Sequence, residues 1–113
     1  ILNVHEGPVS ISKRGQIGLK KGHILSNEPG YYEEGQFGIR HETLVHVTAA
    51  HEGYLKFETL TCFPFDRQLI DKAYLSSEHI AWLNAYHHSV YERLAPHLET
   101  DVKLWLADRC APL

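Results

Sequence analysis

The chain has 113 residues, of which 43% are hydrophobic and 22% are charged, and its formal net charge is −3. This length suits one small domain with a modest core. The mild charge comes without a basic stripe, which excludes a nucleic-acid partner, and no apolar run approaches the ~20 residues that a membrane-spanning helix needs.

Cysteine and methionine usage bears on the setting and on the extent of the protein. Cys62 and Cys110 are far apart and lack the spacing of a metal site, so a reduced, cytoplasmic setting is expected. The sequence contains no methionine and opens on Ile1-Leu2-Asn3-Val4, which is typical of the middle of a domain. We therefore expect this chain to be the carboxy-terminal piece of a longer protein.

A strand is predicted over residues 23–29, where a short apolar run is followed by Pro29 and Gly30. Proline fixes its own backbone angle and pushes the preceding residue, Glu28, toward an extended conformation. Glycine accepts turn conformations that other residues avoid, so the chain is expected to reverse at Gly30.

Further strands are predicted over residues 37–48 and 53–62. A polar connection with a hairpin tip at 33–35 precedes the second strand, and a loop over 49–52 separates it from the third. Together the three segments predict a curved antiparallel sheet.

The rest of the chain has the pattern of helices. Ser76 is suited to cap a helix, and Glu78 would meet the positive end of its dipole in the first turn. Apolar residues then recur at helical spacing at Ile80, Leu83, Tyr86 or His87, Val90 and Leu94. Pro96 is expected to kink or end this helix.

A second helix is predicted to be capped by Thr100, with Val102, Trp105 and Leu106 as its apolar face. The predicted fold class is therefore α+β, with a curved antiparallel sheet followed by two C-terminal helices.

Two acidic residues, Glu28 and Glu42, lie in or at the end of predicted strands rather than in a solvated run of charges. Side chains alternate between the two faces of a strand, so Arg40 and Glu42 point the same way. A guanidinium and a carboxylate on one face can hold each other in place. With Glu28, this pattern indicates the carboxylate half of a metal site.

Several segments carry a resemblance to one enzyme family. They are Asn3-Val4-His5-Glu6-Gly7-Pro8, Asn27-Glu28-Pro29-Gly30-Tyr31-Tyr32, Phe37-Gly38-Ile39-Arg40 with Glu42, Phe57-Glu58-Thr59-Leu60-Thr61 with Pro64, Asp66 and Leu69-Ile70-Asp71, and Trp82-Leu83-Asn84-Ala85-Tyr86-His87. Together they resemble Xaa-Pro aminopeptidase (aminopeptidase P) and prolidase, the pita-bread metallopeptidases. The last two segments favour the cytosolic aminopeptidase P branch.

The resemblance implies that residues 1–65 form the C-terminal half of a pita-bread catalytic domain and that residues 66–113 form the C-terminal helical extension. It also implies an enzyme that releases the N-terminal residue preceding proline, so the expected partners are peptides with proline at the second position. Self-association into a homodimer or a higher oligomer is expected as well.

In this family two divalent metal ions are held by two aspartates, one histidine and two glutamates. The resemblance implies that Glu28 binds one ion and that Glu42 bridges both, with manganese favoured by the carboxylate-rich ligand set. It implies that Arg40 orients these ligands, with Tyr32 a weaker candidate for the same role. His5 matches a histidine that lines the substrate pocket.

The family's two aspartates and its metal-binding histidine lie upstream of the segments matched here. Two carboxylates and an arginine do not make a tight metal site. The isolated chain is therefore expected to be inactive and free of metal.

The chain has nine histidines, which raises the possibility of a histidine-rich metal site. His87 and His88 are adjacent on a predicted helix and point to different sides, and His41 and His46 have opposite parity on a predicted strand. We therefore interpret the histidines as scattered surface and interface residues.

Two other classes of function stay open at this point. One is a pita-bread fold that has lost catalysis and serves as a binding or chaperone module. The other is a dimerisation unit, for which Trp82, Tyr86 and Trp105 would offer apolar surface. The presence of His5 together with Glu28, Arg40 and Glu42 argues for the enzyme, because a binding module has no chemical need for all four.

Overall fold

The computed structural model of the protein describes residues 7–113, which divide into two compact units. The described part of the first, the sheet unit, comprises residues 7–61, and the second, the helical unit, comprises residues 62–113. Strands lie in the first unit and the α-helices lie in the second, so the α+β fold class is confirmed.

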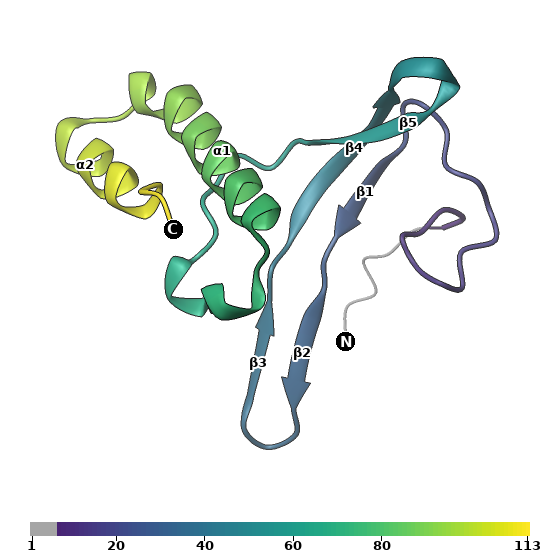
Figure 1. Cartoon of the computed structure of the whole chain (residues 1–113), viewed down its shortest axis with the longest axis horizontal. Coiled ribbons are helices and arrows are strands. Elements are labelled where there is room, and N and C mark those ends of the chain that lie inside the picture. The colour runs from purple at the N-terminus through teal and green to yellow at the C-terminus, as the bar shows by residue number, and fades with distance from the viewer. Residues whose placement is uncertain (1–6) are drawn as a thin grey trace. The chain divides into compact units, whose positions relative to one another are not determined.

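The described residues of the sheet unit form five strands, all paired antiparallel (Figure 1). Three of them form a sheet in the order β1-β4-β5, and the other two form the hairpin β2-β3. Their bounds are β1 Ile24–Asn27, β2 Gly30–Glu33, β3 Phe37–Arg40, β4 Thr43–Ala49 and β5 Leu55–Thr59. Figure 1 shows the hairpin extending beyond the end of the sheet.

One long ribbon links the sheet to the hairpin. Asn27 pairs with Thr43 in the sheet, and Gly30 pairs with Arg40 in the hairpin, so the register is the same on both sides of a short break in the strand pairing at residues 28–29 and 41–42. Within this break, the backbone N–H of His41 donates a hydrogen bond to the carbonyl of Pro29 at 3.2 Å.

Two predictions are wrong at this break in the strand pairing, one of a strand and one of a chain reversal. The predicted strand over 37–48 is divided into β3 and β4, because residues 41 and 42 leave the ladder. The chain does not reverse at Gly30, which begins β2 and has no positive φ. The reversal takes place at the predicted hairpin tip, where Gly35 has a φ of 71°.

The core of the sheet unit lies on one face of β1 and β4. Leu25, Val45 and Val47 are buried there, and Val9 and Leu19 pack against them. Leu25 is paired with Val45, and since paired residues share a face, this small cluster fixes which side of the ribbon faces the core. The opposite face carries Ser26 and Glu28.

The connection between β4 and β5 is a 3₁₀ turn over His51–Gly53, in the place of the predicted loop. Glu52 and Gly53 both have positive φ, at 52° and 80°. This turn shortens the third strand, which covers Leu55–Thr59 rather than the predicted 53–62.

Helix α1 spans Ser77–Leu94, and its predicted start is confirmed. Ser76 accepts a hydrogen bond from the N–H of His79 at 3.2 Å, and the His79 ring accepts one from the N–H of Ser76 at 3.4 Å. This reciprocal capping satisfies two amide groups that the helix itself leaves unpaired. A 3₁₀ turn over Ala95–His97, containing Pro96, follows the helix.

Helix α2 spans Thr100–Arg109 and lies beside α1 (Figure 1). The predicted cap is wrong by one residue, because Glu99 holds the capping position and Thr100 is already helical. The core of the helical unit is made by Val90, Leu106 and Cys110. Of the predicted apolar face, Leu106 is buried, whereas Val102 and Trp105 remain 42% and 45% exposed.

His87 corrects the interpretation of the histidines as surface and interface residues. Its side chain is fully buried, and its Nε2 accepts a hydrogen bond from the backbone N–H of Phe65 at 3.1 Å. Burial, assisted by the positive charge of Arg67, lowers the pKa of His87. This histidine is therefore a neutral core residue of the helical unit.

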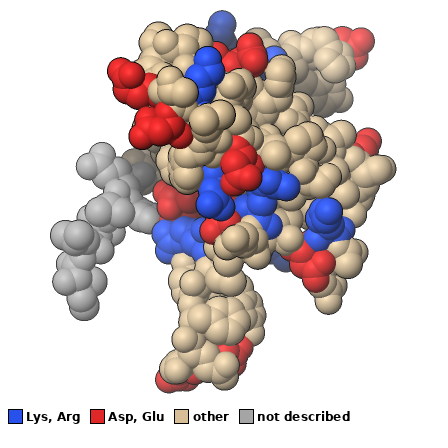
Figure 2. Space-filling model, turned by 90° about the vertical axis from the view of Figure 1, so that its left-hand side faces the viewer, with Lys and Arg blue, Asp and Glu red and all other residues tan. Residues whose placement is uncertain are grey.

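Acidic and basic side chains lie next to each other on the face that Figure 2 presents. Neither α1, nor α2, nor any shorter helix within residues 7–113 has the length and apolarity required to span a bilayer.

Candidate metal centre

A cavity of about 1120 Å³ opens on the ribbon at the break in the strand pairing. Residues 7–12 and 24–30 line it, together with Tyr32, Arg40, Glu42 and Leu44. The side chains that alternate onto this face include Ser26, Glu28 and Tyr32 from one strand of the ribbon and Arg40 and Glu42 from the other.

The two acidic residues lie opposite each other in this ribbon. Asn27 pairs with Thr43 and Gly30 with Arg40, so the continued register places Glu28 across from Glu42. Like charges that face each other across two strands destabilise the pairing. A compensating positive charge is therefore needed at this point.

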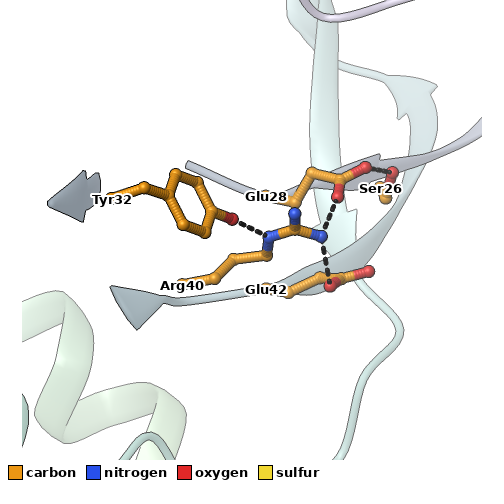
Figure 3. A network of polar contacts seen from close by, with 5 residues as sticks. All are labelled: Ser26, Glu28, Tyr32, Arg40 and Glu42. Atoms are coloured by element: carbon orange, nitrogen blue, oxygen red, sulfur yellow. Dashed lines mark hydrogen bonds and ion pairs between the residues drawn. The ribbon is translucent and has the colours of Figure 1, made fainter. Parts of the chain in front are cut away.

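Arg40 supplies that charge (Figure 3). Its Nη1 atom lies 2.7 Å from Oε2 of Glu28 and 3.8 Å from Oε2 of Glu42. The side chains of Arg40 and Glu42 are 45% and 48% exposed, so these contacts contribute little to stability. Their main effect is to hold both carboxylates in defined positions toward the cavity.

Two hydroxyl groups complete the network in Figure 3. The Ser26 hydroxyl donates a hydrogen bond to Oε1 of Glu28 at 2.6 Å, on the side away from Arg40. Nε of Arg40 donates to the Tyr32 hydroxyl at 2.8 Å. The bond to Tyr32 is the main cause that raises the pKa of Arg40, and the two carboxylates add to it.

The structure brings together four of the five residues predicted from the sequence, namely Glu28, Tyr32, Arg40 and Glu42. The fifth, His5, lies outside the described residues. Ser26 was not predicted. The signal that could have identified it is its position two residues before Glu28 on a strand, where both side chains share a face.

The donor set fits part of a metal centre. Carboxylate oxygens are suitable ligands for manganese and other hard divalent ions, and Glu28 and Glu42 could serve as such ligands. Within residues 7–113 no three histidine, cysteine, aspartate or glutamate side chains are grouped so that they could hold an ion. Among the described residues, Glu28 and Glu42 are therefore the two carboxylates on this cavity that could serve as metal ligands.

Comparisons with protein families give matches along nearly the whole chain. Residues 1–49 match metallopeptidase family M24, and residues 53–113 match the C-terminal region of peptidase M24. The aminopeptidase P2 of Arabidopsis thaliana is 46% identical over 99% of this chain, which covers 17% of that protein. A probable Xaa-Pro aminopeptidase P of Coprinopsis cinerea is 40% identical over 99% of the chain and 20% of its own length.

A solved structure gives the same result. The crystal structure of X-prolyl aminopeptidase from Caenorhabditis elegans, described as a cytosolic enzyme with a di-nuclear active site, matches with a TM-score of 0.84 and 38% identity. The match covers 99% of this chain and 20% of that one. The chain thus spans about a fifth of the length of the proteins that it matches.

Proposed function

This chain belongs to metallopeptidase family M24, and on that premise we propose that it forms the C-terminal part of an aminopeptidase that releases the N-terminal residue preceding proline. Its mixed α+β structure is that of the C-terminal part of a pita-bread fold. The observation that carries the proposal is the placement of Glu28 and Glu42 opposite each other on a cavity wall, with Arg40 in contact with both.

In the proposed site, Glu28 would hold one of two divalent ions and Glu42 would contact both. Such ions, when bound, would acidify a water molecule and polarise the scissile carbonyl. Manganese suits the oxygen ligands. Arg40 and Ser26 keep the carboxylate oxygens of Glu28 oriented, so that the ligands are already in place before an ion arrives.

The remaining roles extend the same proposal. Tyr32 restrains Arg40 through its hydroxyl, and His5 lines the substrate pocket. The substrates are peptides with proline at the second position, and the enzyme acts in the cytoplasm as a homodimer or higher oligomer. Residues 1–65 belong to the catalytic domain and residues 66–113 to a helical extension.

We further propose that the chain alone is inactive. The reason is the ligand count, because a dinuclear centre cannot be completed by the two carboxylates that residues 7–113 bring together. The longer relatives are five to six times the length of this segment, which leaves room for the other ligands.

The test compares the complete protein with this chain in the presence of manganese, using an Xaa-Pro dipeptide as substrate. We expect the complete protein to cleave the dipeptide, and we expect Glu28→Gln and Glu42→Gln to abolish cleavage. Glu34→Gln, in the exposed hairpin turn, is the matched control and should retain activity. The chain alone should neither cleave the dipeptide nor retain two manganese ions.

A complete protein that is inert with manganese and with other divalent ions would contradict the proposal. The non-catalytic binding or chaperone module would then become the better account of this fold. Cleavage that survives both glutamine variants would instead show that the active site lies elsewhere.

A further inference from the structure

Two glycines lie on the same face of the β2-β3 hairpin as Tyr32 and Arg40. Gly38 is paired directly with Tyr32, and Gly30 is paired directly with Arg40. Residues two apart on a strand share a face, as do residues that are directly opposite. The four residues therefore form one patch, in which Tyr32 and Arg40 are diagonal neighbours with glycines at the other two corners.

The Tyr32 ring lies against both glycines. A Cβ atom built on Gly38 would be 2.7 Å from Cδ1 and 3.1 Å from Cε1 of Tyr32. A Cβ atom built on Gly30 would be 2.7 Å from the Tyr32 hydroxyl oxygen and 2.9 Å from its Cε2. Side chains at either position would therefore occupy the space that the ring now fills.

Backbone freedom does not explain these two glycines. Gly22, Gly35 and Gly53 have positive φ, which favours glycine, whereas Gly30 and Gly38 do not. An alanine at position 30 or 38 would be compatible with the strand conformation, and the atoms nearest to its Cβ would be those of the Tyr32 side chain. What these positions require is the absence of a side chain.

The position of the ring decides where its hydroxyl lies. Lying flat along the hairpin, Tyr32 places its hydroxyl 2.8 Å from Nε of Arg40, and the guanidinium carbon lies 5.8 Å from the ring centroid (Figure 3). Arg40 is therefore restrained from the Tyr32 side while its Nη1 contacts the carboxylates. A raised ring would lose the bond to Nε and leave the guanidinium restrained only by the acidic residues.

We infer that Gly30 and Gly38 are positioning residues of the metal centre, which act by leaving room for the Tyr32 ring to lie flat and hold Arg40 between Glu28 and Glu42. The contacts of the Tyr32 ring with the two glycines and with Arg40 do not depend on the proposed function. Their consequence for hydrolysis rests on it.

The first experiment measures solvent exchange of the Arg40 Nε–H proton by NMR in the 113-residue chain, where no metal is required. We expect Gly38→Ala and Gly30→Ala to speed this exchange to the rate seen in Tyr32→Phe, which lacks the hydroxyl. Gly18→Ala is the matched control, because a Cβ there meets nothing within 4 Å and the backbone φ is not positive. Wild-type exchange in both alanine variants would overturn the inference.

The second experiment combines each glycine change with Tyr32→Ala and measures kcat/KM of the complete protein. In the wild-type background we expect Gly38→Ala to lower kcat/KM about tenfold, a typical loss for residues that orient metal ligands. In the Tyr32→Ala background the same change should have no further effect, because the group that it displaces is gone. An equal loss in both backgrounds would overturn the inference, since the glycine would then act through the backbone.

Folding of the variants is itself informative. If Gly38→Ala unfolds the chain but the double variant with Tyr32→Ala folds, the clash with the ring is demonstrated. If both fail to fold, the glycine has another role and the inference is wrong. If the wild-type complete protein does not cleave Xaa-Pro dipeptides, the proposed function fails, while the exchange experiment still decides the role of the glycines.

Discussion

The sheet unit and the helical unit differ in where their ionisable groups lie and in whether those groups are charged. In the sheet unit, Glu28, Arg40 and Glu42 share one wall of a cavity, where Arg40 contacts both carboxylates. In the helical unit, His87 is fully buried, and its low pKa keeps it neutral. Charges that line a cavity and restrain one another remain available to a ligand, whereas a buried neutral histidine only completes the packing.

The comparison shows that the residues of the proposed site and the core residues of the helical unit lie in different units of the chain. The sheet unit has a small core of Leu25, Val45 and Val47, yet it holds all the residues of the proposed site that the structure describes. The helical unit has its own core around Val90 and Leu106. If this division is correct, changes in one core should leave the other unit's structure intact.

Leu106→Ala should have the largest effect on stability. Leu106 is 1% exposed, and truncating such a leucine destabilises a protein by roughly 2–5 kcal/mol through lost burial and the cavity that remains. Hydrogen exchange should show faster exchange of the α1 and α2 amides, with little change in β4. Val47→Ala, at about 2 kcal/mol, should show the converse pattern.

Equal acceleration in both units after either change would contradict the division. It would mean that the two cores unfold as a single cooperative structure. The comparison between the units would then describe packing only and not stability.

Arg40→Met should have the next largest effect, and it should be confined to the sheet unit. Without the guanidinium, Glu28 and Glu42 face each other uncompensated, and their orientation toward the cavity is lost. We expect kcat/KM of the complete protein to fall about 10- to 100-fold, with unchanged amide exchange in α1 and α2. Arg40→Lys should not restore activity, because one ammonium cannot reproduce the separate contacts of Nε and Nη1.

Arg14→Met is the control for Arg40, since Arg14 is an exposed arginine in the same unit. Activity of Arg40→Met at the level of this control would show that the carboxylates keep their positions without the arginine. The role assigned to Tyr32 would fail with it.

His87 should make the helical unit sensitive to pH. Because its pKa is lower in the folded state than the ~6.5 of an unfolded histidine, the unfolded state binds more protons in mildly acidic solution. Stability is therefore complete above about pH 6.5 and is lost as the pH falls toward the folded pKa. The loss is about 1.4 kcal/mol for each unit between the two pKa values.

Urea unfolding of the helical unit at about pH 7.5 and about pH 5 measures this effect. His87→Gln should flatten the pH dependence, because glutamine can still accept a hydrogen bond but does not gain a proton. His88→Gln, at the exposed neighbouring position, should leave the dependence unchanged. A dependence that persists in His87→Gln would assign it to another group.

Much of the fold was accessible from local sequence signals. Ser76 predicted the start of α1, because capping depends on a side chain and an amide only three residues apart. Arg40 and Glu42 were predicted to share a face, because alternation along a strand fixes the face of each side chain, and the family resemblance added Glu28 to the same site. These features depend on short-range geometry, which the order of residues determines directly.

Other features depend on partners far away in the sequence. His87 was grouped with the surface and interface histidines, although the apolar spacing also allowed it on the buried face of the helix. Its hydrogen-bond partner, Phe65, is 22 residues distant and belongs to a segment without helical or strand periodicity. The break between β3 and β4 could not be predicted, because the pattern of apolar residues does not change at residues 41 and 42. Gly38 and Gly30 showed their role only when the position of the Tyr32 ring was known.

We propose that Glu28 and Glu42 face each other in order to bind metal. The most direct measurement is a crystal structure of the complete protein with manganese, using anomalous scattering to locate the ions. We predict two ions, both in contact with Glu42 and one of them with Glu28, and an Arg40 that still contacts a carboxylate and Tyr32. Ions bound away from both glutamates, with Arg40 alone between the two carboxylates, would contradict the account.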